Sequence, residues 1–349
     1  MKAILKYSIA ILIFCFIGIH TITAHDDFSK VIKKEYTVNP DAKLIIDNKF
    51  GKVHCDNWDK NSISIEVTIM VAASNESAAA KILNKISVVI NGSSSQVEAR
   101  TVFAEGDFHG RNKIHIDYKI TMPVSINLDL TNKFGDIYIN ELGGTGKIEL
   151  SYGNMEVNKL TNSDNLLNIK FSKVDIESIQ GAVLTLKFSD IRIEYAGSLR
   201  LDSKYSTIDA AQVISITGTY EGGKLNMENS TAVDSKSKFS DLNITRIAKT
   251  LNLDIQYGNC DVHEMPADFT NINILNKYGN VSIGISKEAS YNLDADLKFC
   301  HLDFPEENAN LTRKVVTNTS NSYKATVGKA TNPSARVTIQ SEYGNVSLE

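Results

Sequence analysis

The chain has 349 residues, of which 42% are hydrophobic, and its 37 basic and 41 acidic residues give a formal net charge of −4. This slightly acidic balance argues against nucleic acid or anionic lipid as the main partner, because both attract basic proteins. We therefore expect no nucleic-acid function.

The first 24 residues have the pattern of a secretory signal peptide. Lys2 and Lys6 precede the uncharged apolar run Tyr7–Ile19, and a small residue, Ala24, ends the segment. The run is shorter than the ~20 residues that a transmembrane helix needs. We expect a cleaved signal at residues 1–24, with an uncleaved anchor as the alternative. No later segment is long and apolar enough to span a membrane, so the sequence predicts an exported protein of the periplasm, the cell surface or the extracellular space.

Three cysteines follow the signal, at Cys55, Cys260 and Cys300. An odd number cannot form a complete disulfide framework. Small thiols of this kind are most often buried in protein cores. We expect all three to be free and buried.

A short unit, Lys-Phe/Tyr-Gly/Ser-x-apolar-x-apolar, recurs along most of the chain. Its copies include KFGKVHC at 49–55, KFGDIYI at 133–139, KFSKVDI at 170–176, KFSDIRI at 187–193, KYSTIDA at 204–210, KFSDLNI at 238–244, KYGNVSI at 277–283 and KFCHLDF at 298–304. Three further copies replace the lysine: SYGNMEV at 151–157, QYGNCDV at 256–262 and EYGNVSL at 342–348. A unit repeated at a short interval indicates a stacked, quasi-one-dimensional architecture.

The unit at Leu184–Ile193 shows how each coil is built. Apolar and polar residues alternate up to Phe188, the alternation breaks at Ser189-Asp190, and it resumes at Ile191. This pattern predicts a strand, a two-residue corner and a second strand. We expect an all-β fold, a parallel β-solenoid of ~18–21-residue coils, right-handed by the rule for parallel crossovers. The repeat aromatics are expected to form an internal stack.

Residues 60–123 do not follow the repeat. They contain strand-like alternation in Ser62–Met70 and one helical segment near residues 75–86, with Ser74 or Asn75 as its cap. The sequence Asn48–Gly51 before this insert matches Asn132–Gly135 after it. We therefore expect one coil, an N-terminal α/β cap insert, and then continued coiling. Residues 25–349 are predicted to form a single domain.

These features together resemble the family described as "putative adhesins", whose members carry a domain of unknown function and are common in Bacteroidetes. The resemblance rests on the early coil, the Asp56–Asp59 turn, the strand-plus-helix insert and the serial coils, and it covers roughly residues 43–349. It implies an adhesin-like β-solenoid on an exported protein. It supplies no catalytic or ligand-binding residues.

The strongest surface candidate is the lysine before the aromatic, at Lys170, Lys187 and Lys204 on three consecutive coils. Stacked coils would place these like charges about 4.8 Å apart. One interpretation is a solvated face compensated by nearby acids, and the other is a basic stripe that binds acidic glycans. A cell-surface glycan or an envelope protein is the expected partner.

Some parallel β-helices are polysaccharide lyases or hydrolases, so an enzyme has to be weighed. Such chemistry needs carboxylates within about 5–10 Å of one another, whereas the corner residues Asp136, Asp190 and Asp241 fall on non-neighbouring coils. We predict no catalytic residues, no metal and no cofactor. The favoured function is a non-catalytic binding or structural module of the cell envelope. The alternatives are a carbohydrate-active enzyme on a parallel β-helix, and an envelope scaffold or stress-linked sensor.

Overall fold

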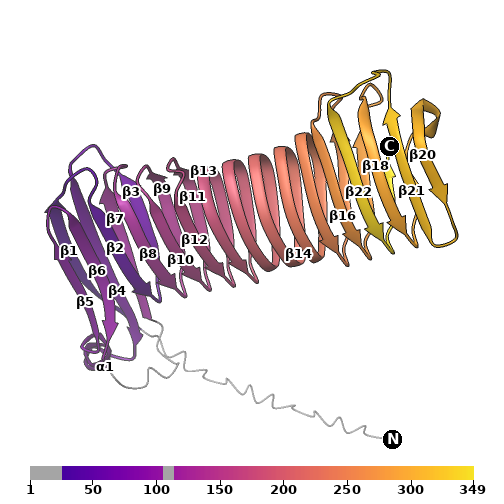
Figure 1. Ribbon diagram of the computed structural model, residues 1–349. Coiled ribbons are helices and arrows are strands. Elements are labelled where there is room, and N and C mark those ends of the chain that lie inside the picture. Colours follow the sequence, from indigo (N-terminus) through magenta and orange to yellow (C-terminus); the bar gives the residue numbers. More distant parts are fainter. Residues whose placement is uncertain (1–25, 105–113) are drawn as a thin grey trace, which may run out of the picture.

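The computed structural model describes residues 26–104 and 114–349. They form an elongated stack of strands with a single α-helix at the N-terminal end (Figure 1). The prediction of an all-β fold is confirmed. The predicted signal peptide lies outside the described residues. Within the described part of the chain, no helix has the length and apolar character needed to cross a membrane.

Most coils contribute one strand to each of two long faces. Face A holds the strands that precede the repeat aromatics: β2 (Lys43–Lys49), β8 (Asn127–Lys133), β10 (Gly146–Ser151), β12 (Asn165–Lys170), β16 (Asn271–Lys277), β18 (Tyr291–Lys298) and β22 (Ala335–Glu342). Face B holds the strands that follow them: β3 (Val53–Asn57), β9 (Ile137–Leu142), β11 (Asn154–Leu160), β15 (Cys260–Met265), β17 (Val281–Ile285), β19 (Leu302–Asp303) and β23 (Val346–Leu348). The long strands β13 (Lys173–Lys187) and β14 (Asp190–Gln256) continue through both faces.

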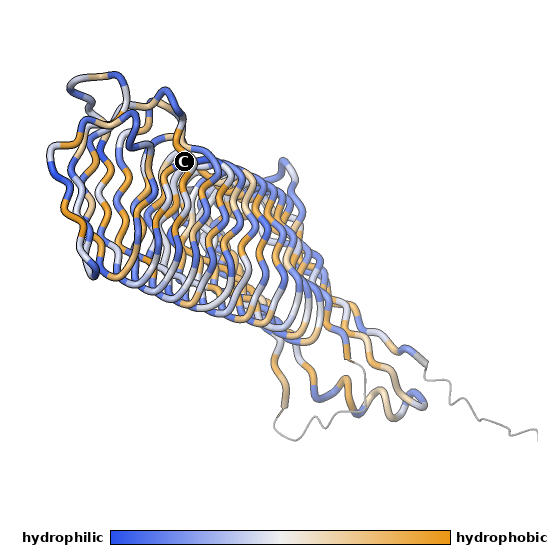
Figure 2. The backbone as a smooth tube through the Cα atoms, turned by 90° about the vertical axis from the view of Figure 1, so that its right-hand side faces the viewer, coloured by the Kyte–Doolittle hydropathy of each residue, from blue (hydrophilic) through white to orange (hydrophobic). Residues whose placement is uncertain are grey.

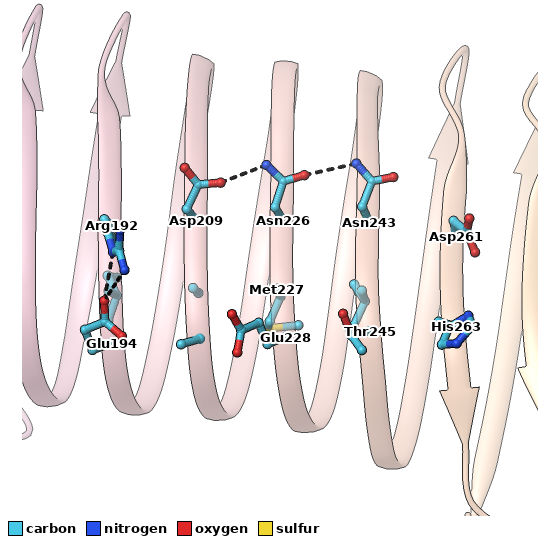
Figure 3. A pocket seen from close by; sticks show the side chains of 14 residues that line it. Arg192, Glu194, Asp209, Asn226, Met227, Glu228, Asn243, Thr245, Asp261 and His263 are labelled. Atoms are coloured by element: carbon cyan, nitrogen blue, oxygen red, sulfur yellow. Dashed lines mark hydrogen bonds and ion pairs between the residues drawn. The ribbon is translucent and has the colours of Figure 1, made fainter.

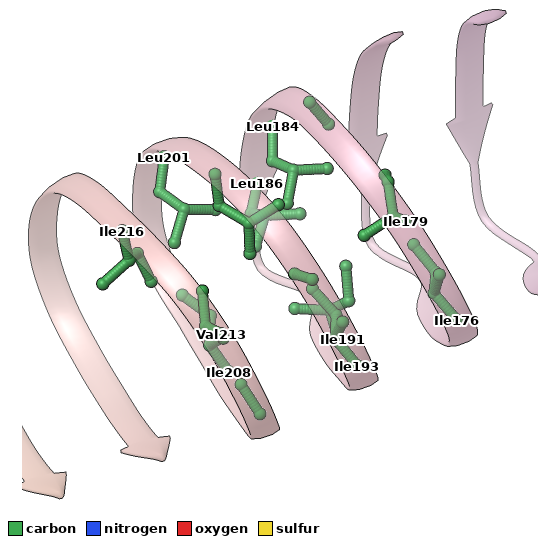
Figure 4. Packing of buried hydrophobic residues seen from close by; sticks show 14 of the residues in the cluster. Ile176, Ile179, Leu184, Leu186, Ile191, Ile193, Leu201, Ile208, Val213 and Ile216 are labelled. Carbon is green, nitrogen blue, oxygen red and sulfur yellow. The ribbon is translucent and has the colours of Figure 1, made fainter. Parts of the chain in front are cut away.

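Successive coils pair in parallel, with equivalent positions opposite one another. Ile148 in β10, for example, is opposite Leu130 in β8 and opposite Leu167 in β12. Along each strand, buried apolar residues alternate with outward polar ones (Figure 2). The inward rows, including Leu184, Ile191 and Ile193, fill the space between the two faces (Figure 4). Each kind of position therefore forms a row along the stack, inside or outside.

The N-terminal end is closed by antiparallel strands and the helix. These elements are β1 (Asp26–Thr37), β4 (Ser62–Ala73), α1 (Glu76–Leu83), β5 (Ile86–Gly92), β6 (Gln96–Phe103) and β7 (Ile114–Met122). β4 pairs with both β1 and β7, and β7 pairs in parallel with β3 on face B. β6 pairs with β2 on face A. Because Lys49 in β2 is opposite Lys133 in β8, the coil before the insert neighbours the coil after it.

Helix α1 begins where its sequence provides a cap. The Asn75 side chain accepts a hydrogen bond from the Ala78 backbone N–H at 2.9 Å, which satisfies one free donor of the first turn. Ala79 is buried against the core. The helix is shorter than the segment near residues 75–86 predicted from sequence.

At the C-terminal end, the order of coils in space differs from their order in sequence. β22 lies between β16 and β18 on face A, and β23 lies between β17 and β19 on face B. Beyond β18, the antiparallel strands β21 (Ser320–Val327) and β20 (Ala309–Val316) extend face A, and a short 3-10 helix, η1 (Glu306–Asn308), precedes them. The last coil in the sequence is therefore an inner coil of the stack.

The prediction that the repeat aromatics lie inside the stack is wrong. All eleven have a positive φ, between 51° and 68°, and ten of them are at least 42% exposed. A residue in the left-handed region reverses the in–out alternation at the corner. Leu186 and Ser189 consequently face inward, and Phe188 between them faces solvent.

The three cysteines of the described chain are free and buried, as predicted. Removal from water raises the pKa of the Cys55 thiol to about 12, with a smaller contribution from the neighbouring Asp56. Burial raises the pKa of the Cys260 thiol to about 12 in the same way, with Asp261 adding to it. Both thiols are therefore kept neutral by the core.

This burial predicts a loss of stability in alkali. An unfolded chain loses these thiol protons from about pH 9, whereas the folded protein keeps them up to about pH 12. The unfolded state then binds fewer protons, so each thiol lowers the free energy of unfolding by about 1.4 kcal/mol per pH unit in that window. Urea unfolding between pH 8 and 10.5 should show a shallower decline for the Cys55→Ala/Cys260→Ala variant than for the wild type. Equal slopes would contradict the assignment.

Candidate binding ridge

The eleven repeat aromatics form a row of exposed rings along one edge of the stack, between face A and face B; we call it the ring row. Its members, in spatial order, are Phe50, Phe134, Tyr152, Phe171, Phe188, Tyr205, Phe239, Tyr257, Tyr278, Tyr343 and Phe299. Neighbouring rings stack with centroids 4.8–5.4 Å apart and planes within 17° of parallel. Such stacked pairs each stabilise by about 0.5–1.5 kcal/mol.

The ring row is interrupted once. The coil between Tyr205 and Phe239 has Gly222 at the ring position, with a φ of +66°. The interruption divides the row into a set of six stacked rings and a set of five. At the N-terminal end, Phe103 meets Phe50 edge-on, with centroids 5.8 Å apart.

The corner after each ring leaves space only for a small inward residue. A Cβ at Gly135 would lie 2.0 Å from the backbone oxygen of Gly51 on the neighbouring coil. In other coils a serine takes this position, and its hydroxyl donates back to the carbonyl of the preceding lysine, as Ser189 does to Lys187 at 2.9 Å. At two of the glycine corners a buried asparagine donates instead: Asn48 to the Gly51 carbonyl at 3.4 Å, and Asn276 to the Gly279 carbonyl at 2.7 Å. Both arrangements give a corner carbonyl a side-chain donor.

The predicted site residues Lys170, Lys187 and Lys204 are brought together by the strand register. Lys170 is opposite Lys187, and Lys187 is opposite Lys204. Lys204 forms an ion pair with Glu221 at 2.7 Å, and this carboxylate raises the lysine's pKa. Within the described residues, neither Lys170 nor Lys187 has an ion pair. The three lysines form a continuous row beside the rings, which we call the lysine row, and only one of them is neutralised.

Lysines elsewhere along the ridge lie against the rings. The Nζ atoms of Lys49, Lys238 and Lys277 are 4.8, 5.3 and 5.6 Å from the ring centroids of the residues that follow them. These are cation–π distances. Cationic and aromatic groups thus share one solvent-exposed edge.

Amide and carboxylate side chains line the other side of the ring row. Asp136 accepts hydrogen bonds from both the backbone and the side-chain nitrogen of Asn154, at 2.9 and 3.0 Å. Towards the C-terminal end, each side-chain oxygen accepts a hydrogen bond from a backbone N–H of the adjacent coil. The acceptors are Asp241, Asn259, Asn280 and Asn345, and their donors are the backbone N–H groups of Asn259, Asn280, Asn345 and His301 in the same order. The Asp or Asn after the small residue thus links neighbouring coils.

A shallow groove lies on face B, away from the ring row (Figure 3). Its volume is about 490 Å³, and four exposed carboxylates line it: Glu194, Asp209, Glu228 and Asp261. Arg192 pairs with Glu194 at 2.7 Å, and Asp209 accepts a hydrogen bond from Asn226 at 2.8 Å. From sequence, outward acids such as Asp209 and Asp261 were treated only as compensation for the lysines, and only the corner aspartates were weighed as catalytic candidates. The signal was present, because all four occupy outward strand positions on nearby coils.

No group of three or more His, Cys, Asp or Glu side chains among the described residues is arranged to hold a metal ion. Of the three corner aspartates weighed as catalytic candidates, Asp136 and Asp241 each hydrogen-bond to an asparagine of an adjacent coil. The structure does not bring the three together, because their coils are not neighbours.

No protein-family model matches this chain, and no curated protein matches it. Among solved structures it is similar to a "putative adhesin" from Bacteroides fragilis NCTC 9343, with 14% identity, coverage of 92% of this chain and 97% of the other, and a TM-score of 0.31. It is also similar to a "putative adhesin" from Parabacteroides merdae ATCC 43184, with 9% identity, 92% and 96% coverage, and a TM-score of 0.29. A "putative lipid binding protein" from Parabacteroides distasonis ATCC 8503 gives 10% identity, 91% and 96% coverage, and a TM-score of 0.27. At these identities and TM-scores, the likeness establishes neither a shared fold nor a shared function.

Two substitutions of one ring test whether the ring row is external. In Phe188→Ala, loss of two stacking contacts should lower the free energy of unfolding by about 1–3 kcal/mol, since the left-handed backbone strain is the same in both proteins. Phe188→Gly should be the more stable of the two by about 1 kcal/mol, because glycine adopts positive φ without strain. Chemical denaturation of both variants measures this order. A buried ring would give the opposite order, with glycine the worse replacement.

Proposed function

We propose that this protein is an exported, non-catalytic, adhesin-like binding module of the cell envelope. Its scaffold is a right-handed parallel β-solenoid, and it acts in the periplasm, at the cell surface or outside the cell. The ring row and the lysine row together form its binding ridge, and an acidic cell-surface polysaccharide is its ligand. The observation that carries this proposal is the continuous line of exposed rings flanked by lysines.

The chemistry of the ridge supports a polymeric and acidic ligand. Within each set of rings the ring faces are covered by neighbours, so the ring edges point outward together with the lysine ammonium groups. Rings repeat every 4.8–5.4 Å along the ridge, a spacing close to the advance of one sugar residue in an extended polysaccharide. Uncompensated Lys170 and Lys187 attract anions, while the apolar edges exclude water from the contact. A chain lying along the ridge can meet the same groups repeatedly.

Exposed apolar surface of this extent is uncommon unless it serves an interaction. Glycine would take the left-handed corner more easily than phenylalanine or tyrosine, as it does at position 222. An aromatic residue at each of the eleven corners therefore carries backbone strain, and ring stacking offsets this strain. The exposed edges are available for binding in addition to that structural role.

The proposal predicts a specific effect of the lysine row. Replacing Lys170, Lys187 and Lys204 together with glutamine should weaken binding to polygalacturonate or alginate by about tenfold or more, since each lost charge contributes a fraction of a kcal/mol to about 1 kcal/mol. Wild-type binding should also weaken as salt rises from 50 to 300 mM, with a smaller salt effect in the variant. Isothermal titration calorimetry or biolayer interferometry gives both quantities.

A matched control is available in the N-terminal cap. Lys30 and Lys34 lie in β1 and Lys60 follows β3; all three are exposed and none belongs to the ridge, so their replacement by glutamine makes the same change in net charge. That variant should bind as the wild type does. Equal weakening in the two triple variants would show that net charge alone governs binding and would contradict the ridge.

The groove on face B supports a second candidate, a polysaccharide hydrolase or lyase. Its four carboxylates lie on one surface, as glycoside cleavage requires of an acid and a base. All four are exposed, however, whereas a catalytic acid usually occupies a desolvated site. The binding module is therefore the favoured function.

Turnover of polysaccharides separates the two candidates. Incubation with polygalacturonate, alginate and neutral glucans, followed by reducing-end and unsaturated-product assays, should show no cleavage by the wild type. Cleavage that is lost in Glu194→Gln or Glu228→Gln would establish the enzyme and overturn the non-catalytic proposal.

A further inference from the structure

The ring row contains one gap, at Gly222, and the two rings beside it are the inner ends of the two stacked sets. Tyr205 and Phe239 are each 57% exposed, the highest values in the row. Each has a stacking partner on one side only, Phe188 for Tyr205 and Tyr257 for Phe239. These two rings therefore direct a free face, rather than an edge, towards the gap.

The width of the gap suits one additional ring. Twice the coil spacing, about 10 Å, separates the ring positions of Tyr205 and Phe239. A ring placed midway would stand about 5 Å from each neighbour, as rings do elsewhere in the row. The Tyr205 ring leans over Gly222, since a Cβ there would lie 2.8 Å from its Cδ1 atom. Opening the full width therefore requires this exposed side chain to rotate back to the line of the row.

Polar groups of both charges surround the gap. On the side of face A, Lys204 pairs with Glu221 at 2.7 Å, and the Nζ of Lys238 lies 5.3 Å from the Phe239 ring centroid. On the side of face B stand the exposed Lys224 and the half-buried Asp241. The rim thus offers three lysine ammonium groups and two carboxylates around the rings of Tyr205 and Phe239.

We propose that this gap is a binding subsite for one pyranose residue of an acidic polysaccharide, held between the faces of Tyr205 and Phe239. Apolar C–H groups on the two faces of a pyranose pack against aromatic rings, and its equatorial hydroxyls and a carboxylate reach donors and acceptors at the edge. An aromatic side chain would fit between the rings but would leave the charged rim without partners. Lys224 and Lys238, which have no ion pair among the described residues, favour an acidic sugar over a neutral one.

This inference rests on the proposed binding function and adds a defined position to it. Between the ends of each stacked set, the ridge presents ring edges and lysines, which bind a polymer in many registers. The gap provides ring faces and fixes one sugar residue. Short oligosaccharides should consequently bind at the gap, whereas long chains use the whole ridge.

The variant Gly222→Phe tests the subsite directly. Aromatic residues at the equivalent positions have φ values of 51–68°, and Gly222 has 66°, so the backbone accepts a ring. The new ring should complete the row and leave the thermal midpoint unchanged or higher. Calorimetric titration with hexagalacturonate should show at least about tenfold weaker binding than for the wild type, equivalent to loss of one ring-face contact.

Two controls keep the test specific. Val89 in β5 of the N-terminal cap is 44% exposed and lies outside the ridge, so Val89→Phe adds a ring there without touching the gap and should bind hexagalacturonate as tightly as the wild type. Neutral cellohexaose should bind the wild type more weakly than hexagalacturonate does.

The outcomes separate the subsite from the ridge. If Gly222→Phe binds hexagalacturonate like the wild type while the lysine-row variant is weakened, the subsite is overturned and the ridge stands. If the wild type binds no acidic oligosaccharide or polymer, both are overturned. Binding of a tryptophan-containing peptide in place of any sugar, lost in Gly222→Phe, would overturn the pyranose assignment.

Discussion

Each coil of this protein turns at a residue held in the left-handed backbone region, and the rest of the structure depends on that corner. The positive φ reverses the in–out alternation, so the ring points to solvent and the next residue points to the core. The inward residue must be small, because a Cβ at Gly135 would meet the backbone of the neighbouring coil at 2.0 Å. Parallel register then repeats this geometry from coil to coil. Rings, lysines and corner amides consequently form straight rows.

The same rows determine what the surface can bind. Stacking offsets the strain of an aromatic residue at the corner, but it also covers the ring faces and leaves only their edges exposed. A ridge of edges and ammonium groups suits an extended acidic polymer. Where Gly222 relieves the strain without a ring, the faces of Tyr205 and Phe239 become accessible. The proposed sugar subsite thus lies where the repeat is broken.

Much of the architecture was predictable from the sequence, because apolar alternation and an interval of 17–19 residues fix strands and coils. The alignment of Lys170, Lys187 and Lys204 on neighbouring coils was predicted from the same interval. The direction of Phe188 was mispredicted, since alternation was carried through a corner that reverses it. The small residue after every ring was the available signal. Insertion of β22 between β16 and β18 was not predictable, because sequence order normally gives spatial order in a stack.

The external position of the rings can be measured directly by hydroxyl-radical footprinting of the folded protein with mass spectrometry. Phe171, Phe188 and Tyr205 should be oxidised at rates close to those of the unfolded chain. The buried rings of Tyr118, Tyr220 and Tyr291, which are 1%, 3% and 2% exposed, should be protected. Protection of the repeat rings equal to that of Tyr220 would place them in the core and contradict both the corner geometry and the binding ridge.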